Sequence, residues 1–256
     1  MFWKLFKFEL NGAYRSFSLF YAILLVSAAF IGFGSLLPQS NLSLFAHFFL
    51  GISAFLYSSM LLAVNILTVV FVVRGFHQSM YKRNAYLTHT LPVSMKQLML
   101  VKILSAVFWI FITLLVEILS AGITIVAAGH LEAIPEFFQI VGRFWAEIHN
   151  KGELFSIMLE GLMLLMEAIT ILYFVVNFVH SIFVQRGRIA IAIILIIVIE
   201  TLESLFLNWF SGHVMISMLN LSDVSMNLVL TLIYLLLVLV WFYGSVYLLE
   251  HKMEVE

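Results

Sequence analysis

The chain has 256 residues, of which 63% are hydrophobic and 11% charged, and its mean hydropathy is +1.10. This composition excludes a soluble monomer and is typical of an integral membrane protein, with room for about six spans of ~20 residues. A net charge of -1 weighs against a nucleic-acid partner, and the lack of cysteine excludes disulfides and thiolate metal sites.

The N-terminal segment mixes basic residues with aromatic and aliphatic ones. This pattern predicts an amphipathic elbow helix over residues 1–15 that lies in the lipid headgroup region. A first span is expected over 17–37, because Pro38 and polar residues follow it. A second span is expected over 45–73 and is closed by Arg74.

Residues 76–102 form the one long polar interruption between apolar runs. Within it, residues 76, 80, 87 and 91 fall on one helical face, which predicts a short amphipathic helix over 76–91. Pro92 ends this helix, and Ser94 with Gln97 has the spacing of a capping box that starts the next one. The alternative is a plain connecting loop with no further role.

The remaining apolar runs predict four more spans and one surface helix. The spans are expected over 103–129, 154–184, 189–210 and 228–249. An amphipathic helix on the extracellular surface of the membrane is expected over 131–152. The predicted fold class is therefore all-α, a polytopic membrane protein with six transmembrane helices in a single domain over 1–256.

The basic residues indicate the orientation of the chain in the membrane. With these spans, all of the 13 lysines and arginines except Arg143 and Lys151 fall on one side. The positive-inside rule places both termini and the segment 76–102 in the cytoplasm.

Motifs of catalytic sites are missing. The sequence contains no GxxxxGK[ST] phosphate loop, no HExxH pair and no GxSxG elbow. The eight histidines are scattered, and no two of them have ligand spacing on one helix, so no metal site is expected. An enzyme is not predicted, and no cofactor is expected on this chain.

Acidic residues within the apolar runs are unusual, because an ionised side chain at the bilayer centre costs about 2.5 to 3.5 kcal/mol on insertion scales. They are the candidate substrate pathway, since carboxylates lining a water-accessible path would favour cationic or amphipathic cargo. Alternatively they are protonated and hydrogen-bond between helices, with Asn65, Asn177, Asn208 or His180 as partners. These residues are Glu117, Glu160, Glu167, Glu200 and Glu203.

Two segments resemble a known family, the permeases of ABC type 2 transporters, in particular small six-span members from Gram-positive bacteria. The opening residues are similar to the family's amphipathic elbow: Lys4, Leu5, Lys7, Glu9, Leu10, Tyr14, Arg15 and Ser16. The polar interruption resembles a family segment that contains an LPVS element: Tyr86, Leu87, Thr88, Leu91, Pro92, Val93, Ser94, Lys96, Gln97, Leu98, Lys102, Ile103 and Leu104.

The resemblance implies that the 76–91 helix is a coupling helix that docks on a separate ABC ATPase, present in two copies, which binds the ATP and Mg²⁺. It also implies a second permease, identical or related, in the bacterial cell membrane, and export of amphipathic or hydrophobic cargo such as peptides, bacteriocins, toxins, drugs or lipids. The family often has an acidic residue and a glycine where this chain has Asn84 and Ala85. The residues expected to contact the ATPase are Phe76, Met80, Lys82, Arg83, Tyr86, Leu87 and Leu91.

A second class of function fits the same segment. A membrane-embedded sensor or assembly factor would use the 76–91 helix to bind a cytoplasmic partner without transporting anything.

Overall fold

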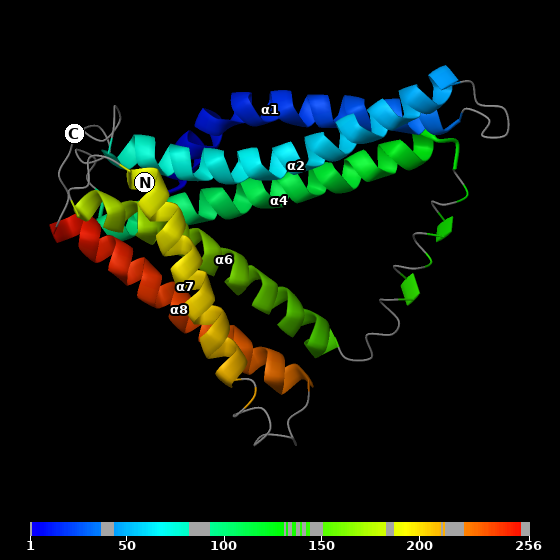
Figure 1. Cartoon of the computed structure of the whole chain (residues 1–256). Helices are drawn as coiled ribbons and strands as arrows, with labels where there is room; N and C mark the ends of the chain where they lie inside the picture. Colours follow the sequence, from blue (N-terminus) through cyan, green and yellow to red (C-terminus); the bar gives the residue numbers. More distant parts are fainter. Residues whose placement is uncertain are drawn as a thin grey trace. The chain divides into compact units, whose positions relative to one another are not determined.

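The computed structural model describes residues 2–36, 44–81, 93–130, 151–182, 187–210 and 223–251, together with isolated positions between these ranges. Six long helices fill these ranges, and no strand occurs in them (Figure 1). The helices are α1 (Phe2–Ser35), α2 (Leu44–Tyr81), α4 (Met95–Ala127), α6 (Lys151–Ser181), α7 (Arg188–Phe210) and α8 (Asp223–His251).

Each helix contains a segment long and apolar enough to cross a membrane. A helix satisfies all its backbone hydrogen bonds within the segment, which lipid requires. All three prolines of the sequence lie outside the six helices. The predicted all-α class with six spans is confirmed, and the chain is a multi-pass membrane protein.

Several predicted boundaries differ from the observed helix ends, and two of the differences merge segments that were predicted as separate. Helix α1 is continuous from Phe2 to Ser35, so the expected elbow over 1–15 and the first span form one helix with no break between them. No proline interrupts this run. Helix α2 continues past residue 73 to Tyr81 and so includes the first part of the expected 76–91 helix. Residues 82–91 and most of the expected 131–152 helix lie outside the described residues.

Both ends of α4 have identifiable caps. The backbone N–H of Gln97 donates to Ser94 Oγ at 3.3 Å, which confirms the predicted helix start. At the other end, His130 N donates to Ile125 O at 3.3 Å and Gly129 N donates to Val126 O at 3.1 Å. Gly129 has a φ of 71°, so this end is a Schellman motif with glycine in the left-handed position.

The helices divide into two compact units. The C-terminal end of α2 and the N-terminal end of α4 belong to one unit, and the rest of both helices belongs to the other. Unit 1 comprises Met1–Val72 and Leu104–Glu147. Its core is aromatic: Phe17 of α1 stacks on Trp109 of α4 with ring centroids 4.4 Å apart, and Tyr21, Leu24 and Val64 are buried around them.

Unit 2 comprises Val73–Ile103 and Ile148–Glu256. Helix α6 is its centre, because it packs against both α7 and α8. The buried residues Ile171, Val175 and Val179 of α6 form the core, with Trp241 of α8 packed against them. None of the α7 side chains is buried.

Gly32 allows α1 and α4 to approach closely in unit 1. A Cβ atom at this position would lie 2.5 Å from Ala127 Cβ and 2.7 Å from the backbone oxygen of Thr124. A backbone atom cannot yield as a flexible side chain can, so any larger residue must separate the helices.

Gly32→Ala is therefore expected to destabilise the protein by about 1–3 kcal/mol, the usual cost of overpacking. Gly122→Ala on α4 is the matched control, because nothing lies within 4 Å of its added Cβ. Both changes raise helix propensity equally. Thermal unfolding in detergent checks this, and a Gly32→Ala melting temperature equal to or above that of Gly122→Ala would contradict the tight approach.

Candidate functional site

A polar stripe on α4 joins the three helices of unit 1. The stripe consists of residues at helical spacing: Thr113, Glu117, Ser120 and Thr124. Tyr21 of α1 and Thr113 have hydroxyl oxygens 2.7 Å apart, and the Thr68 hydroxyl of α2 lies 3.1 Å from the same threonine. Such interhelical hydrogen bonds help to hold helices together in lipid.

Glu117 belongs to this stripe. Its Oε1 atom accepts a hydrogen bond from Asn65 Nδ2 of α2 at 2.5 Å. One turn further along, the hydroxyl groups of Tyr57 and Ser120 are 3.0 Å apart. Glu117 thus has an asparagine on a neighbouring helix as its partner, one of the partners expected from the sequence. It lies in unit 1, whereas the other four acidic candidates belong to unit 2.

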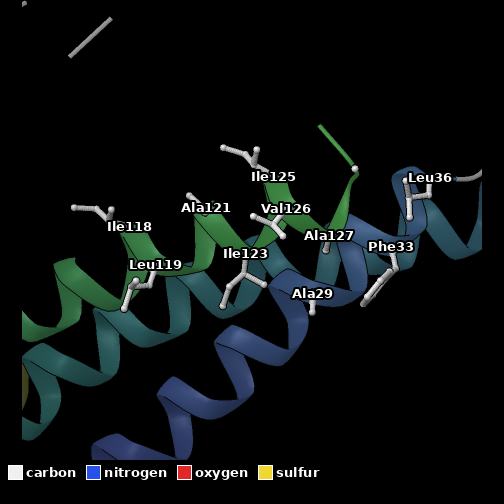
Figure 2. Close-up of a pocket in the computed structure, with 12 residues that line it drawn as sticks. Ala29, Phe33, Leu36, Ile118, Leu119, Ala121, Ile123, Ile125, Val126 and Ala127 are labelled. Carbon is white, nitrogen blue, oxygen red and sulfur yellow. The ribbon is translucent and has the colours of Figure 1, made fainter. Parts of the chain in front are cut away.

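An apolar groove also lies in unit 1, between the C-terminal parts of α1 and α4. It has a volume of about 970 Å³. Figure 2 shows side chains from both helices along it, including Phe33 of α1 and Leu119 and Ile123 of α4. Among the residues that the structure describes, no acidic or basic one lines this groove, so its surface suits hydrocarbon rather than a charged group.

The central acidic pair lies in unit 2, where α6, α7 and α8 meet. Glu167 of α6 is 5% exposed, and it shares a side-chain hydrogen bond with Glu203 of α7. Glu203 also accepts a hydrogen bond from Trp241 Nε1 of α8 at 2.8 Å. One carboxyl oxygen, Glu167 Oε1, is buried and has no hydrogen-bond partner among the described residues.

Two further acidic residues surround this pair. Glu160 is half-buried on α6, and Glu200 is exposed on α7 and interacts electrostatically with Glu167. The hydroxyl of Tyr234 on α8 interacts electrostatically with Glu160, Glu167 and Glu203. Four of the five predicted acidic residues therefore gather in unit 2. We call this group, with Tyr234 and Trp241, the acidic cluster.

The sequence did not identify Tyr234 and Trp241 as members of a site. Aromatic residues are common in this chain, which has nine tyrosines and five tryptophans. The available signal was weak: a tyrosine and a tryptophan within an apolar span each carry a polar group that needs a partner in lipid.

The first residues of the expected coupling helix are buried within unit 2. Phe76 is 1% exposed, and its ring stacks on Tyr173 of α6 with centroids 4.1 Å apart and planes 11° apart. Met80 is completely buried. These two side chains therefore anchor the end of α2 inside the protein. The other expected coupling residues lie outside the described residues: Lys82, Arg83, Tyr86, Leu87 and Leu91.

A histidine and tyrosine cluster lies beside this anchor, between the ends of α2 and α6. The Nε2 atoms of His77 and His180 are 3.0 Å apart. The Tyr81 hydroxyl donates to Asn177 Oδ1 at 2.8 Å, and the Tyr81 ring stacks on His180 with centroids 4.1 Å apart. Sequence reasoning missed this cluster because its two histidines are 103 residues apart.

Comparisons with known proteins add no family assignment. No family model, curated protein or solved structure matches this chain.

Proposed function

We propose that the chain is the permease subunit of an ABC exporter. In this proposal it moves an amphipathic or hydrophobic substrate outward, driven by ATP that a separate ATPase subunit hydrolyses with Mg²⁺. The observation that carries the proposal is the polar segment 82–94, which joins the buried end of α2 to the capped start of α4 and carries the resemblance to type 2 permeases. The lack of a phosphate loop in the sequence agrees with a separate ATPase.

The anchor at the end of α2 supports a coupling role for the segment that follows it. Phe76 stacks on Tyr173 of α6, and Met80 is buried one turn further along α2. A push from the ATPase would therefore reach α6 through this aromatic contact. The residues that would receive it are Lys82, Arg83, Tyr86, Leu87 and Leu91. In this scheme Phe76 and Met80 transmit force and do not touch the ATPase.

The acidic cluster is the proposed contact for the cargo. Helix α6, which the anchor would move, also carries Glu160 and Glu167. The buried Glu167 oxygen without a partner offers an acceptor to an ammonium or guanidinium group. A cationic amphipathic compound, with peptides and bacteriocins as the first choice, therefore fits the cluster best, and a drug or a lipid with a cationic group ranks after it.

The proposed setting is the bacterial cell membrane, with both termini in the cytoplasm, two ATPase copies and a second permease that is identical or related. Glu200 supports a protein neighbour for α7, because it is exposed in an apolar span and ionisable residues rarely face lipid.

Assembly tests the proposal. The chain is co-expressed with the ABC ATPase that the proposal expects to be encoded beside it, and the complex is extracted in detergent and sized by light scattering. Two permeases and two ATPases should elute together. Lys82→Glu with Arg83→Glu should release the ATPase, while the matched pair Lys4→Glu with Lys7→Glu should not. A chain that elutes without any ATPase would overturn the proposal.

A further inference from the structure

We propose that His77 and His180 form a binding site for one divalent transition-metal ion. The site lies within unit 2, between the C-terminal ends of α2 and α6. The two imidazoles come from different helices, α2 and α6. Their Nε2 atoms are 3.0 Å apart, with ring centroids 4.8 Å apart and planes 55° apart. The proposal does not depend on transport.

The hydrogen bonding of His180 turns a lone pair toward His77. His180 Nδ1 lies 2.8 Å from the backbone oxygen of Val176, and this oxygen can only accept. Nδ1 therefore carries the hydrogen, and Nε2 of the neutral ring presents its lone pair. A backbone carbonyl bound to the distal ring nitrogen is the usual support of a metal-ligating histidine. The Tyr81 ring, stacked on His180 at 22° between planes, holds the imidazole in this orientation.

The separation of the two nitrogens suits adjacent ligands of one ion. Imidazole nitrogens bind at about 2.1 Å. Two such bonds at about 90°, as in square-planar or octahedral sites, place the nitrogens about 3.0 Å apart. In the metal-free protein the same distance fits a hydrogen bond from His77 Nε2 to His180 Nε2. An ion bound to both nitrogens lies to one side of the line between them and replaces that hydrogen bond, and the neutral His77 then carries its proton on Nδ1.

The chemistry of the donors indicates which ion binds. Neutral imidazoles without thiolates prefer Cu²⁺, Ni²⁺ or Zn²⁺ over Mg²⁺ or Ca²⁺, and the 90° geometry favours Cu²⁺ and Ni²⁺. The described residues contain no cluster of three or more histidine, cysteine, aspartate or glutamate side chains suited to a metal. A site with two protein ligands, completed by water, binds an exchangeable ion.

The test uses the full chain, purified in detergent through a tag without histidines. Cu²⁺ is titrated in and followed by electron paramagnetic resonance, with Ni²⁺ binding measured by calorimetry. One ion per chain should bind, with nitrogen hyperfine structure from the imidazoles. His77→Gln and His180→Gln should each weaken binding about tenfold or more, which corresponds to about 1.4 kcal/mol or more. His47→Gln, an exposed histidine near the start of α2, should leave binding unchanged.

Gel filtration and thermal unfolding verify that each variant is folded. If a glutamine variant aggregates, His77→Cys replaces it, because a thiolate also binds Cu²⁺ and Ni²⁺. This variant should still bind one ion, now with a sulfur-to-metal charge-transfer band. Binding that is equal in the wild type and in both glutamine variants, a His77→Cys protein without that band, or no bound ion at all would overturn the proposal.

Discussion

Phe76→Ala should destabilise the protein by about 3–5 kcal/mol, the range for truncating a buried phenylalanine. The reason is geometric: Phe76 is 1% exposed and stacks face to face on Tyr173, so its removal leaves a cavity between the ends of α2 and α6 and deletes an aromatic pair. Equilibrium unfolding of the purified chain in mixed micelles measures the change.

Phe55→Ala is the matched control for this prediction. Phe55 lies on the same helix and is 71% exposed, so its truncation should change the free energy of unfolding by no more than about 0.5 kcal/mol. Equal losses for the two variants would mean that Phe76 does not anchor α2 on α6. If the proposed function holds, the Phe76→Ala protein should also lose ATPase coupling, because the segment proposed to meet the ATPase follows this anchor.

Glu167→Gln with Glu203→Gln should lower transport of a cationic amphipathic peptide about tenfold or more and leave the fold intact. Glutamine keeps the size of glutamate, and its amide oxygen can still accept from Trp241 Nε1, but the negative charge is lost. Hydrogen bonds to charged groups contribute about 1.5–3 kcal/mol, so the loss of one such contact corresponds to a factor of about ten or more.

The measurement is ATP-driven uptake of a fluorescent cationic peptide into inside-out vesicles that contain the chain and the ATPase proposed as its partner. Glu117→Gln is the first control, because Glu117 bonds to Asn65 in unit 1, outside the acidic cluster. Glu250→Gln, exposed near the end of α8, is the second. Uptake that is unaltered by the double substitution, with the same peptide transported by the wild type, would remove the acidic cluster from the cargo path.

Much of the fold follows from the sequence, because the rules that govern it are local. A run of apolar residues without proline has to be helical in lipid, and this rule alone predicts all six helices. The start of α4 was also predictable, since a serine cap acts on an amide three residues away. The pairing of Glu117 with Asn65 was among the expected partnerships, because amide side chains are rare in these spans.

Helical periodicity could not predict what the end of α2 packs against. Residues 76 and 80 share a helical face whether that face meets a membrane surface, an ATPase or another helix of the same chain. The burial of Phe76 is decided by Tyr173, which is 97 residues further along the chain and has the matching aromatic face. No local pattern contains this information.

The acidic cluster and the histidine pair both form through packing between helices that are distant in the sequence. The sequence shows Glu160 and Glu167 on one face of α6, but only the packing of α7 and α8 on that helix brings Glu203, Tyr234 and Trp241 to them. A spacing rule within one helix likewise cannot find His77 and His180, because this pair forms between two helices.

ATP turnover tests whether this chain works with an ATPase. The ATPase is assayed in proteoliposomes alone, with the wild-type chain, and with the Lys82→Glu and Arg83→Glu double variant. Hydrolysis should depend on the wild-type chain, rise further with cationic peptide, and fall to the level of the ATPase alone in the variant. Hydrolysis that is the same with and without the chain would mean that the chain is not the permease of this ATPase.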